Sequence, residues 1–442
     1  MFPLILPMHG LGGGADLPIP APFAIAGGTA ALLLSFIVLL LAWRTPRFAT
    51  TGGERTIRPD VAAFLDSRGW TMSIRALGTA FFCFMLWPAL FGPDLLSNPT
   101  FGVVYVWLWV GVVPASLLFG RFYRAVSPAC TVHLVLSKAA GRQPSEGTRH
   151  YPAWLGYWPA AVGLFAFVWL ELVSPQATYL GPVRTWFAFY LAAMLLGGVI
   201  FGERWLERAD PFEVYSTLLA HLSPWARNDQ GDLVWISPLR HLARVPGEPG
   251  LVATVAVLLG STAYDSWRES VTWIRFVQSG GIDQTVLGTA GLLTAVTVVG
   301  VVFMAASMAT GVDDGADRRR VPRQLAHSIV PIVVGYMVAH YLSFFVQVGS
   351  QTLIQISDPI GTGANLFGTA DWEVNYWFSQ HATLLASTKV VAIVSGHVLG
   401  VIAAHDRALE ILPRRHQVAG QLPLLFTMVL YTYMGLYLLF GA

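Results

Sequence analysis

Long runs of apolar residues follow one another along almost the whole of this 442-residue chain. A helix of about 20 residues is needed to cross roughly 30 Å of bilayer hydrocarbon, and runs of about that length recur throughout. They lie near residues 22–43, 73–91, 101–119, 154–174, 183–202, 250–266, 285–309, 325–347, 382–404 and 421–441. The pattern predicts an all-α fold, a polytopic transmembrane helix bundle of about ten spans.

The loops between these runs predict the orientation in the membrane, because Lys and Arg gather on the cytoplasmic side. The arginine-rich loops are 44–72, 120–153, 203–248, 311–323 and 405–420, whereas loops 92–100, 174–182 and 348–380 contain neither Lys nor Arg. We therefore expect a multi-pass protein of the cytoplasmic (inner) membrane with both termini outside. Residues 1–21 then form an external N-terminal arm, residues 22–442 a single integral membrane helical domain, and 348–380 its longest external loop.

The N-terminal half also contains two similar segments, which predict a tandem duplication. Residues 117–136 resemble residues 199–219, so the repeats span about 73–136 and 154–219. In each copy a Phe-Gly pair is followed by a basic turn, and Gly120 matches Gly202. Each copy then offers a helix N-cap followed by proline at the first helical position: Ser127-Pro128 and Asp210-Pro211.

The composition agrees with a membrane protein and narrows the partners to expect. Hydrophobic residues make up 55% of the chain and charged residues 12%, whereas soluble domains carry about 25% charged residues. The net charge of +2 favours neither nucleic acid nor an acidic substrate. The expected partners are the lipid bilayer and a small apolar substrate, with no nucleic acid. Two cysteines, Cys83 and Cys130, are too few for a disulfide framework, so we expect free thiols.

Four ionisable residues inside the apolar runs form the candidate catalytic site. At about 1.5 Å per residue, all four lie roughly 24 Å from the inner surface: Glu171, Asp265, His340 and Lys389. Their charges are complementary, so Lys389 could pair with Glu171 or Asp265, with His340 nearby. A buried pair can simply lock a bundle, whereas ionisable groups within spans commonly serve catalysis or transport. Both interpretations stay open.

Histidines near the inner surface form a second polar layer with Asp406. His405 and Asp406 are expected at the inner water interface, either solvated or capping, and His397 lies about two turns deeper. About 12 Å along the helix axis separates His397 from His405, too far for both to bind one metal ion. Any metal site must therefore be assembled between helices.

Short motifs at both ends and in the middle of the chain carry a resemblance to a known family. They are His9-Gly10-Leu11-Gly12-Gly13 with Asp16-Leu17-Pro18-Ile19-Pro20, then Asp210-Pro211-Phe212-Glu213-Val214-Tyr215, and Gly396-His397 with Ala404-His405-Asp406. Together they resemble a family of bacterial and archaeal polytopic membrane proteins commonly labelled fenitrothion hydrolase. The label implies hydrolysis of an organophosphate triester, with a native substrate other than the man-made pesticide.

Hydrolysis of a phosphotriester usually needs an activated water and an electrophile, most often a divalent metal with His and carboxylate ligands. The activity implied by the resemblance therefore points to a divalent transition metal, zinc or copper. Candidate metal ligands are His340, His381, His9 and His397. Asp265 and Glu171 could supply carboxylates, and Lys389 could neutralise charge that develops on a phosphoryl group.

Three functions remain compatible with the sequence. The first is a membrane-embedded, metal-assisted hydrolase of an apolar ester or phosphoester that enters from the outer leaflet. The second is a transporter or metal-handling permease, which the duplication and the two His-containing layers favour. The third is a non-catalytic subunit of a membrane complex, in which the polar layer only orders the helices. Motifs for ATP hydrolysis, c-type haem attachment and the serine-hydrolase nucleophile elbow are missing from the sequence, which therefore supports none of these three chemistries.

Overall fold

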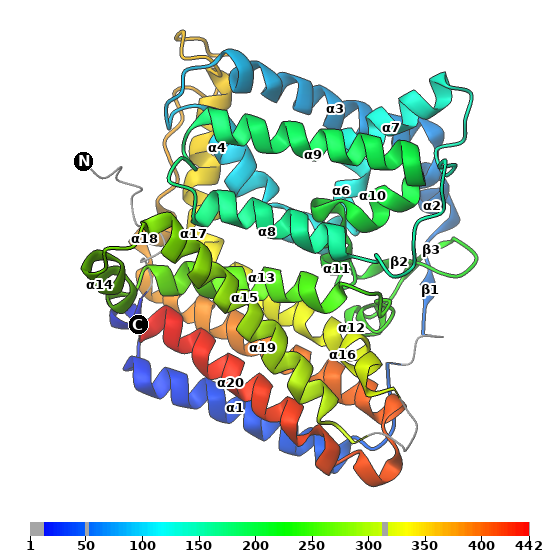
Figure 1. Ribbon diagram of the computed structural model, residues 1–442, viewed down its shortest axis with the longest axis vertical. Helices are drawn as coiled ribbons and strands as arrows, with labels where there is room; N and C mark the ends of the chain where they lie inside the picture. Colours follow the sequence, from blue (N-terminus) through cyan, green and yellow to red (C-terminus); the bar gives the residue numbers. More distant parts are fainter. Residues whose placement is uncertain (1–12, 49–52, 312–316, 442) are drawn as a thin grey trace. The chain divides into compact units, whose positions relative to one another are not determined.

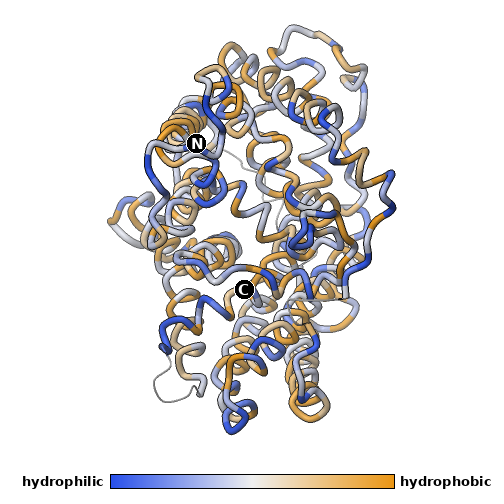
Figure 2. Tube along the Cα trace, turned by 90° about the vertical axis from the view of Figure 1, so that its right-hand side faces the viewer, coloured by the Kyte–Doolittle hydropathy of each residue, from blue (hydrophilic) through white to orange (hydrophobic). Residues whose placement is uncertain are grey.

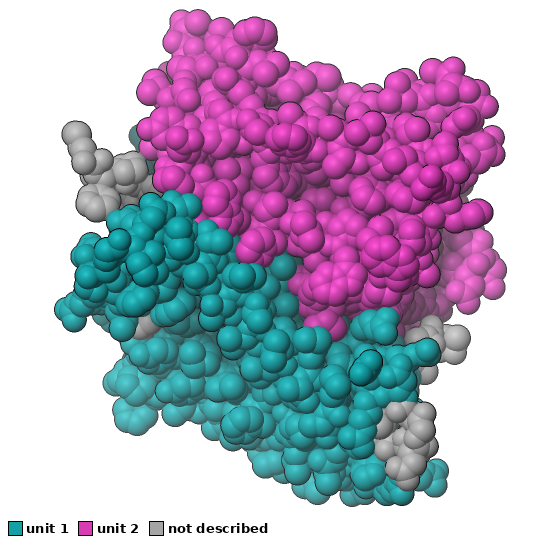
Figure 3. Space-filling model, viewed as in Figure 1, with its two compact units in different colours: residues 1–48, 255–353, 372–442 teal, residues 49–254, 354–371 magenta. Residues whose placement is uncertain are grey.

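A computed structural model describes residues 13–48, 53–311 and 317–441, and these residues are mostly helical (Figure 1). Contacts divide the chain into two compact units (Figure 3). Unit 1 comprises Met1–Phe48, Val255–Leu353 and Trp372–Ala442, and unit 2 comprises Ala49–Thr254 and Ile354–Asp371. The single domain predicted for residues 22–442 therefore separates into two units. Two of the four borders, 254/255 and 353/354, fall inside helices, where no linker composition marks them.

Unit 1 is helical, and its N-terminal, C-terminal and penultimate helices run side by side (Figure 1). Its helices are α1 (Ala21–Ala42), most of α13 (Leu251–Arg268), α14 (Val271–Ser279), α15 (Gln284–Met308), α16 (Val321–Leu325), most of α17 (Val330–Ser357), α18 (Trp377–Gln380), α19 (Ala382–Ile411) and α20 (Leu422–Phe440). The helices α1, α19 and α20 pack against one another, and α15 packs on α20.

Unit 2 combines helices with one small sheet. The helices are α2 (Pro59–Asp66), α3 (Arg68–Phe91), α4 (Pro99–Gly102), α5 (Val112–Phe119), α6 (Phe122–Val126), α7 (Pro128–Ala139), α8 (Trp158–Leu172), α9 (Leu180–Phe201), α10 (Glu203–Ala209), α11 (Pro211–Ala220) and α12 (Pro238–Leu242). The strands β1 (Arg55–Thr56), β2 (Trp225–Arg227) and β3 (Leu233–Trp235) pair antiparallel in the order β1-β3-β2.

The all-α class is confirmed for the described residues, and their long apolar helices agree with a multi-pass membrane protein. Among the described residues, seven helical stretches are long and apolar enough to cross a bilayer, or eight if a pair bent by 46° counts as one span. That pair joins Pro99–Leu108 to Val112–Phe119, and its middle part is π-helical over Val103–Leu108. Figure 2 shows the apolar residues concentrated along the helices. The number ten stays a prediction, because α8 has only 15 residues and α13 is not among the seven.

The two turns that the sequence matched share their local structure. The preceding helix ends at a glycine with positive φ in both, 76° at Gly120 and 67° at Gly202, a conformation that glycine adopts without steric cost. A short helix follows, and then a polar residue caps the next helix. Ser127 accepts a hydrogen bond from the backbone N–H of Cys130, and Asp210 accepts from those of Phe212 and Glu213. The predicted N-caps are thereby confirmed.

Glycines bring the backbones of α17 and α19 into direct contact in unit 1. A Cβ atom on Gly335 would lie 2.5 Å from the carbonyl oxygen of Ala392, and one on Gly396 would lie 2.6 Å from that of Pro331. Only a residue without a side chain allows such an approach, which is a common way of packing helices in membranes. The two helices that carry His340 and Lys389 therefore meet without intervening side chains.

His405 and Asp406 are buried, whereas the sequence placed them at the inner water interface. Their exposed fractions are 2% and 3%. The Asp406 carboxylate accepts hydrogen bonds from the backbone N–H groups of Arg47 (2.6 Å) and Phe48 (3.0 Å) and from the Trp43 indole (3.2 Å). Asp406 therefore caps the turn after α1, in agreement with the capping alternative. Cys83 and Cys130 are free thiols, as predicted.

Candidate active site

The polar site of unit 1 is built around the carboxylate of Asp265, near the C-terminal end of α13. His340 Nε2 lies 2.9 Å from Asp265 Oδ2, and the Tyr341 hydroxyl donates to the same oxygen over 2.7 Å. The other oxygen, Oδ1, accepts from Arg268 Nε over 2.8 Å. Asp265 is 1% exposed and His340 is 2% exposed. The structure thus brings together two of the four residues that depth along the helices had selected.

Ser266 and Tyr336 extend this pair into a hydrogen-bonded chain. The Ser266 hydroxyl lies 3.2 Å from His340 Nδ1 and 3.2 Å from the Tyr336 hydroxyl. Ser266 follows Asp265 directly on α13, and Tyr336 precedes His340 by one turn on α17. Ser266 and Tyr336 are also buried, at 6% and 3% exposure. Two helices therefore supply the entire chain.

The donors and acceptors among these groups determine which atom carries each proton of the hydrogen-bonded chain. An ionised carboxylate accepts hydrogen bonds only, so Nε2 of His340 must carry the proton that faces Asp265. In a neutral imidazole the other nitrogen is then an acceptor, so Nδ1 accepts from the Ser266 hydroxyl. The Tyr336 hydroxyl in turn donates to Ser266 Oγ. Ser266 is therefore a hydroxyl whose proton faces a base, and Asp265 orients that base.

Lys389 lies on the face of α19 that packs toward α17, the helix that carries Tyr336 and His340. Ala386 and Ile393, each about one turn away from Lys389, belong to one apolar cluster with Tyr336 and Ala339 of α17. Lys389 is 1% exposed, although an ammonium group is costly to bury without opposite charges.

Two carboxylates interact electrostatically with the Lys389 ammonium. They belong to Asp16 and Glu269, whereas the sequence had suggested Glu171 or Asp265 as partners. Glu269 also lies within electrostatic reach of Asp265 and His340. The charges around Asp265 and Lys389 therefore form one connected group in unit 1.

Glu171, the fourth predicted residue, belongs to unit 2. It lies in the last turn of α8, and its carboxylate interacts electrostatically with the hydroxyls of Tyr105 and Tyr215. Tyr105 donates a 2.8 Å hydrogen bond to the carbonyl of Ala177, and Tyr215 packs on Trp109. The surroundings of Glu171 are thus the aromatic core of unit 2.

The predicted metal ligands do not fit a metal site in the described part of the chain. Both ring nitrogens of His340 are hydrogen-bonded, to Asp265 and to Ser266. His381 is exposed and stacks on Trp377, with its Nδ1 2.8 Å from the Trp377 carbonyl. The described residues contain no group of three or more His, Cys, Asp or Glu that could hold a metal ion.

The other two predicted ligands are His397 and His9. His397 is buried, with Nδ1 2.9 Å from the carbonyl oxygen of Ile393, while His9 lies outside the described residues. We therefore derive no step through a metal ion.

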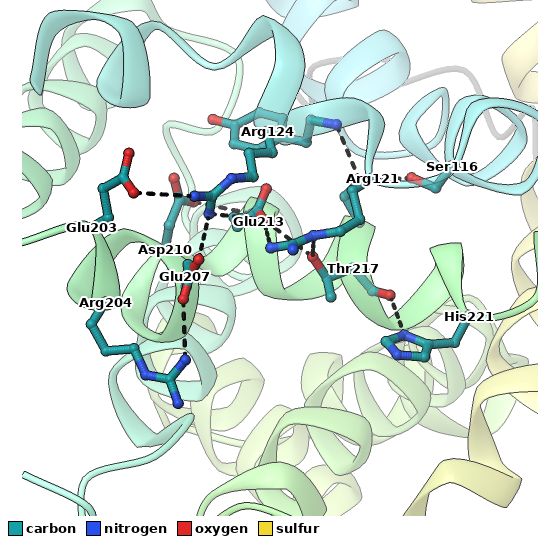
Figure 4. A network of polar contacts seen from close by, with 12 residues as sticks. Ser116, Arg121, Arg124, Glu203, Arg204, Glu207, Asp210, Glu213, Thr217 and His221 are labelled. Carbon is teal, nitrogen blue, oxygen red and sulfur yellow. Dashed lines mark hydrogen bonds and ion pairs between the residues drawn. The ribbon is translucent and has the colours of Figure 1, made fainter. Parts of the chain in front are cut away.

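Unit 2 contains a second polar network, between α5, α6, α10 and α11 (Figure 4). The fully buried Glu213 carboxylate pairs with Arg121 over 2.7 Å, and Arg124 lies 3.1 Å from Glu207. These arginines are part of the basic turns that predicted the orientation. Because each is neutralised by a carboxylate, the network first of all stabilises the fold.

Asp210 lies at the buried end of this network. Its carboxylate accepts a 2.8 Å hydrogen bond from the Tyr190 hydroxyl, which itself lies 2.9 Å from that of Tyr123. Burial raises the pKa of Asp210 to about 7, although the hydrogen bond from Tyr190 lowers it. This carboxyl group therefore changes its charge near neutral pH, outside the membrane-spanning helices.

Comparisons with known proteins found no match: no protein-family model, no curated protein and no solved structure is similar to this chain. The functional argument therefore depends on the geometry of the site. Sequence reasoning missed Ser266, Arg268 and Tyr336, although a signal was present. Ser266 and Arg268 follow Asp265 by one and three residues, and Tyr336 shares a helix face with His340.

Proposed function

We propose that this protein is a membrane-embedded hydrolase of apolar esters or phosphoesters. The observation that carries the proposal is the hydrogen-bonded chain from Ser266 through His340 to Asp265. A hydroxyl, a base and a carboxylate in this order are the arrangement by which unrelated hydrolases activate a serine nucleophile. Here Nδ1 faces the serine and Nε2 the carboxylate, which requires the proton on Nε2.

Each group has one role in the proposed reaction. Ser266 Oγ attacks the carbonyl carbon or phosphorus, and its proton passes to Nδ1 of His340. The bond to the leaving oxygen breaks, and that oxygen takes the proton from Nδ1. A water molecule then gives a proton to Nδ1 while its oxygen attacks the acyl or phosphoryl group. Ser266 departs and regains its proton, so one water is consumed in each cycle.

Charge that develops on the substrate oxygen needs hydrogen-bond donors. The Tyr336 hydroxyl, 3.2 Å from Ser266 Oγ, can turn toward that oxygen once Oγ has bonded to the substrate. The Lys389 ammonium supplies positive charge from the neighbouring face of α19. An apolar substrate suits this site, because it lies among membrane-spanning helices and the lipid can deliver it.

The proposed number of spans and the proposed orientation are those predicted from the sequence. We place α8 and α13 among the spans, which gives about ten, with both termini outside the inner membrane. The shared turns at Gly120 and Gly202 support a tandem duplication. The resemblance to the family labelled fenitrothion hydrolase remains a prediction and points to the same reaction class.

The experiment is covalent labelling of the purified, detergent-solubilised protein with a fluorophosphonate. Ser266 Oγ would displace fluoride from phosphorus, and mass spectrometry of peptides would find the added phosphonyl group on Ser266. Ser266→Ala should lose both labelling and hydrolysis of a nitrophenyl ester. Asp265→Asn should lower kcat by roughly 10³- to 10⁴-fold, because the imidazole would no longer be held in the required tautomer.

Ser307→Ala is the matched control. Ser307 is a fully buried serine on α15 whose hydroxyl has no hydrogen-bond partner among the described residues, so labelling should persist. Labelling that survives in Ser266→Ala would show that another nucleophile reacts. Unlabelled wild-type protein without esterase activity would reject the hydrolase and favour the transporter alternative.

A further inference from the structure

The N-terminal segment Gly13–Leu17, part of the external arm predicted for residues 1–21, is folded onto unit 1. Gly14–Asp16 form one turn of 3-10 helix. The Asp16 N–H donates to the carbonyl of Gly13, and the Gly13 N–H donates to the Asp16 carboxylate, each over 3.1 Å. The turn packs against α19 and α20. It is therefore held both by its own hydrogen bonds and by two membrane helices.

Two contacts fix the position of this turn. A Cβ atom on Gly14 would collide with the carbonyl oxygen of Phe440 at the end of α20, so the two backbones touch. Leu17 packs against the apolar cluster that contains Ile25 and Tyr336. Because Tyr336 also bonds Ser266, the N-terminal segment packs on the cluster that supports the nucleophile.

Asp16 and Lys389 link the segment to the site by charge. Leu17 packs against the apolar cluster that contains Ala386 and Ile393, which lie about one turn to either side of Lys389 on α19. Next to Leu17, Asp16 interacts electrostatically with the Lys389 ammonium. A lysine side chain has four rotatable carbon–carbon bonds and three N–H donors, so its ammonium needs fixed acceptors to point in one direction. Asp16, tied to the backbone of Gly13, places a fixed negative charge near Lys389, and Glu269 supplies another.

We propose that the N-terminal segment completes the active site and that Asp16 is the positioning residue for Lys389. This inference rests on the proposed hydrolase function only for the expected effect on kcat. Asp16 directs the ammonium toward the substrate oxygen that gains negative charge, while Gly14 and Leu17 hold Asp16 in place. The substrate of this site is consequently an ester or phosphoester with an oxygen that Lys389 can reach.

A thermal double-mutant cycle in the full-length protein tests the link without any assay of activity. The variants are Asp16→Asn, Lys389→Met and both together. If the two side chains interact, Asp16→Asn should lower the melting temperature in the wild-type background and change it little in Lys389→Met. Asp283→Asn, an exposed N-cap carboxylate of α15, is the control and should be additive with Lys389→Met. Additive effects of Asp16→Asn would overturn the proposal.

Kinetics and hydrogen exchange separate positioning from mere stabilisation. Asp16→Asn should lower kcat by roughly 10- to 100-fold with KM little changed, and Asp16→Glu should restore much of it. Gly14→Ala should reproduce the kcat loss and speed amide exchange in residues 13–17, because the added Cβ displaces the turn from Phe440. Unchanged exchange in Gly14→Ala would contradict the docking. If the wild type hydrolyses nothing, the thermal cycle still decides whether Asp16 holds Lys389.

Discussion

A single carboxylate orders the candidate active site at the scale of residues. Asp265 accepts hydrogen bonds from His340, Tyr341 and Arg268 through its two oxygens. Removing one partner of such a buried group leaves the others without a counter-charge, which typically costs 3–5 kcal/mol. Asp265→Asn also removes the charge, but it keeps the size of the side chain and one acceptor oxygen, so it is more informative than truncation to alanine.

Asp210 provides a prediction on the pH dependence of stability. Its folded-state pKa is raised by burial to about 7, above a usual value near 3.9. The folded state therefore binds the proton more tightly than the unfolded state does. The stabilisation is fully present below about pH 4 and is lost as the pH rises toward 7, by an amount of the order of 4 kcal/mol.

The melting temperature of the detergent-solubilised protein should accordingly fall between pH 5 and pH 8. In Asp210→Asn the fall should be much shallower, since the amide does not titrate and still caps α11. Some slope will remain, because burial also raises the pKa of Glu213. The exposed N-cap variant Asp283→Asn should keep the wild-type slope, and an unchanged slope in Asp210→Asn would contradict the assignment.

The sequence selected Asp265, His340 and Lys389 as members of one polar layer, and Asp265 and His340 lie within hydrogen-bond distance of each other, but it could not select Ser266 or Arg268 as partners. Counting residues along a span gives the depth of a side chain, whereas its direction around the helix axis depends on packing. Ser266 and Arg268 could not be selected, because counting residues does not give the direction of a side chain around the helix axis. Asp16 was hidden because nothing in a Gly- and Pro-rich segment predicts the helix on which it folds.

At the scale of elements, the glycine contact between α17 and α19 yields a matched pair of variants. Gly396→Ala should destabilise the protein by about 1–3 kcal/mol, since the added methyl group would press on the carbonyl of Pro331. Gly27→Ala, in α1, has nothing within 4 Å of the added Cβ and should be neutral or stabilising by about 0.4–1 kcal/mol. Thermal unfolding of both variants checks the difference, and equal effects would contradict the contact.

Elements were predicted well where local signals were strong. The long apolar helices and the N-caps at Ser127 and Asp210 follow from sequence alone. The helix α14 was missed, because nine amphipathic residues between two spans look like a loop. Its place depends on packing, as Trp273 contacts Tyr264 and Trp267 of α13.

At the scale of the whole molecule, the orientation can be tested by single cysteines in a background without Cys83 and Cys130. Glu373→Cys lies in the loop without Lys or Arg, and Asp229→Cys lies in an arginine-rich loop; both positions are exposed. A membrane-impermeant maleimide should label the first in intact cells and the second only after permeabilisation. The reverse pattern would invert the proposed topology.

The division into two units could not be predicted from hydropathy. The chain passes from unit 2 to unit 1 within α13 and returns within α17, so a border crosses continuous helices. Hydropathy records only whether a segment is apolar, and both units contain long apolar helices, such as α3 and α9 in unit 2 and α15 and α19 in unit 1. Which helices share a core is decided by long-range contacts.

The backbone contact between α17 and α19 also constrains how unit 1 can move. Side chains can change rotamer and allow two helices to slide, but touching backbones at Gly335 and Gly396 leave nothing to rearrange. The two helices should therefore behave as one stiff body that carries His340 and Lys389 at a constant separation. An opening that admits a substrate should therefore come from other elements of unit 1 that move against this body. Where α13 or the N-terminal turn moves, Ser266 or Asp16 would travel with it.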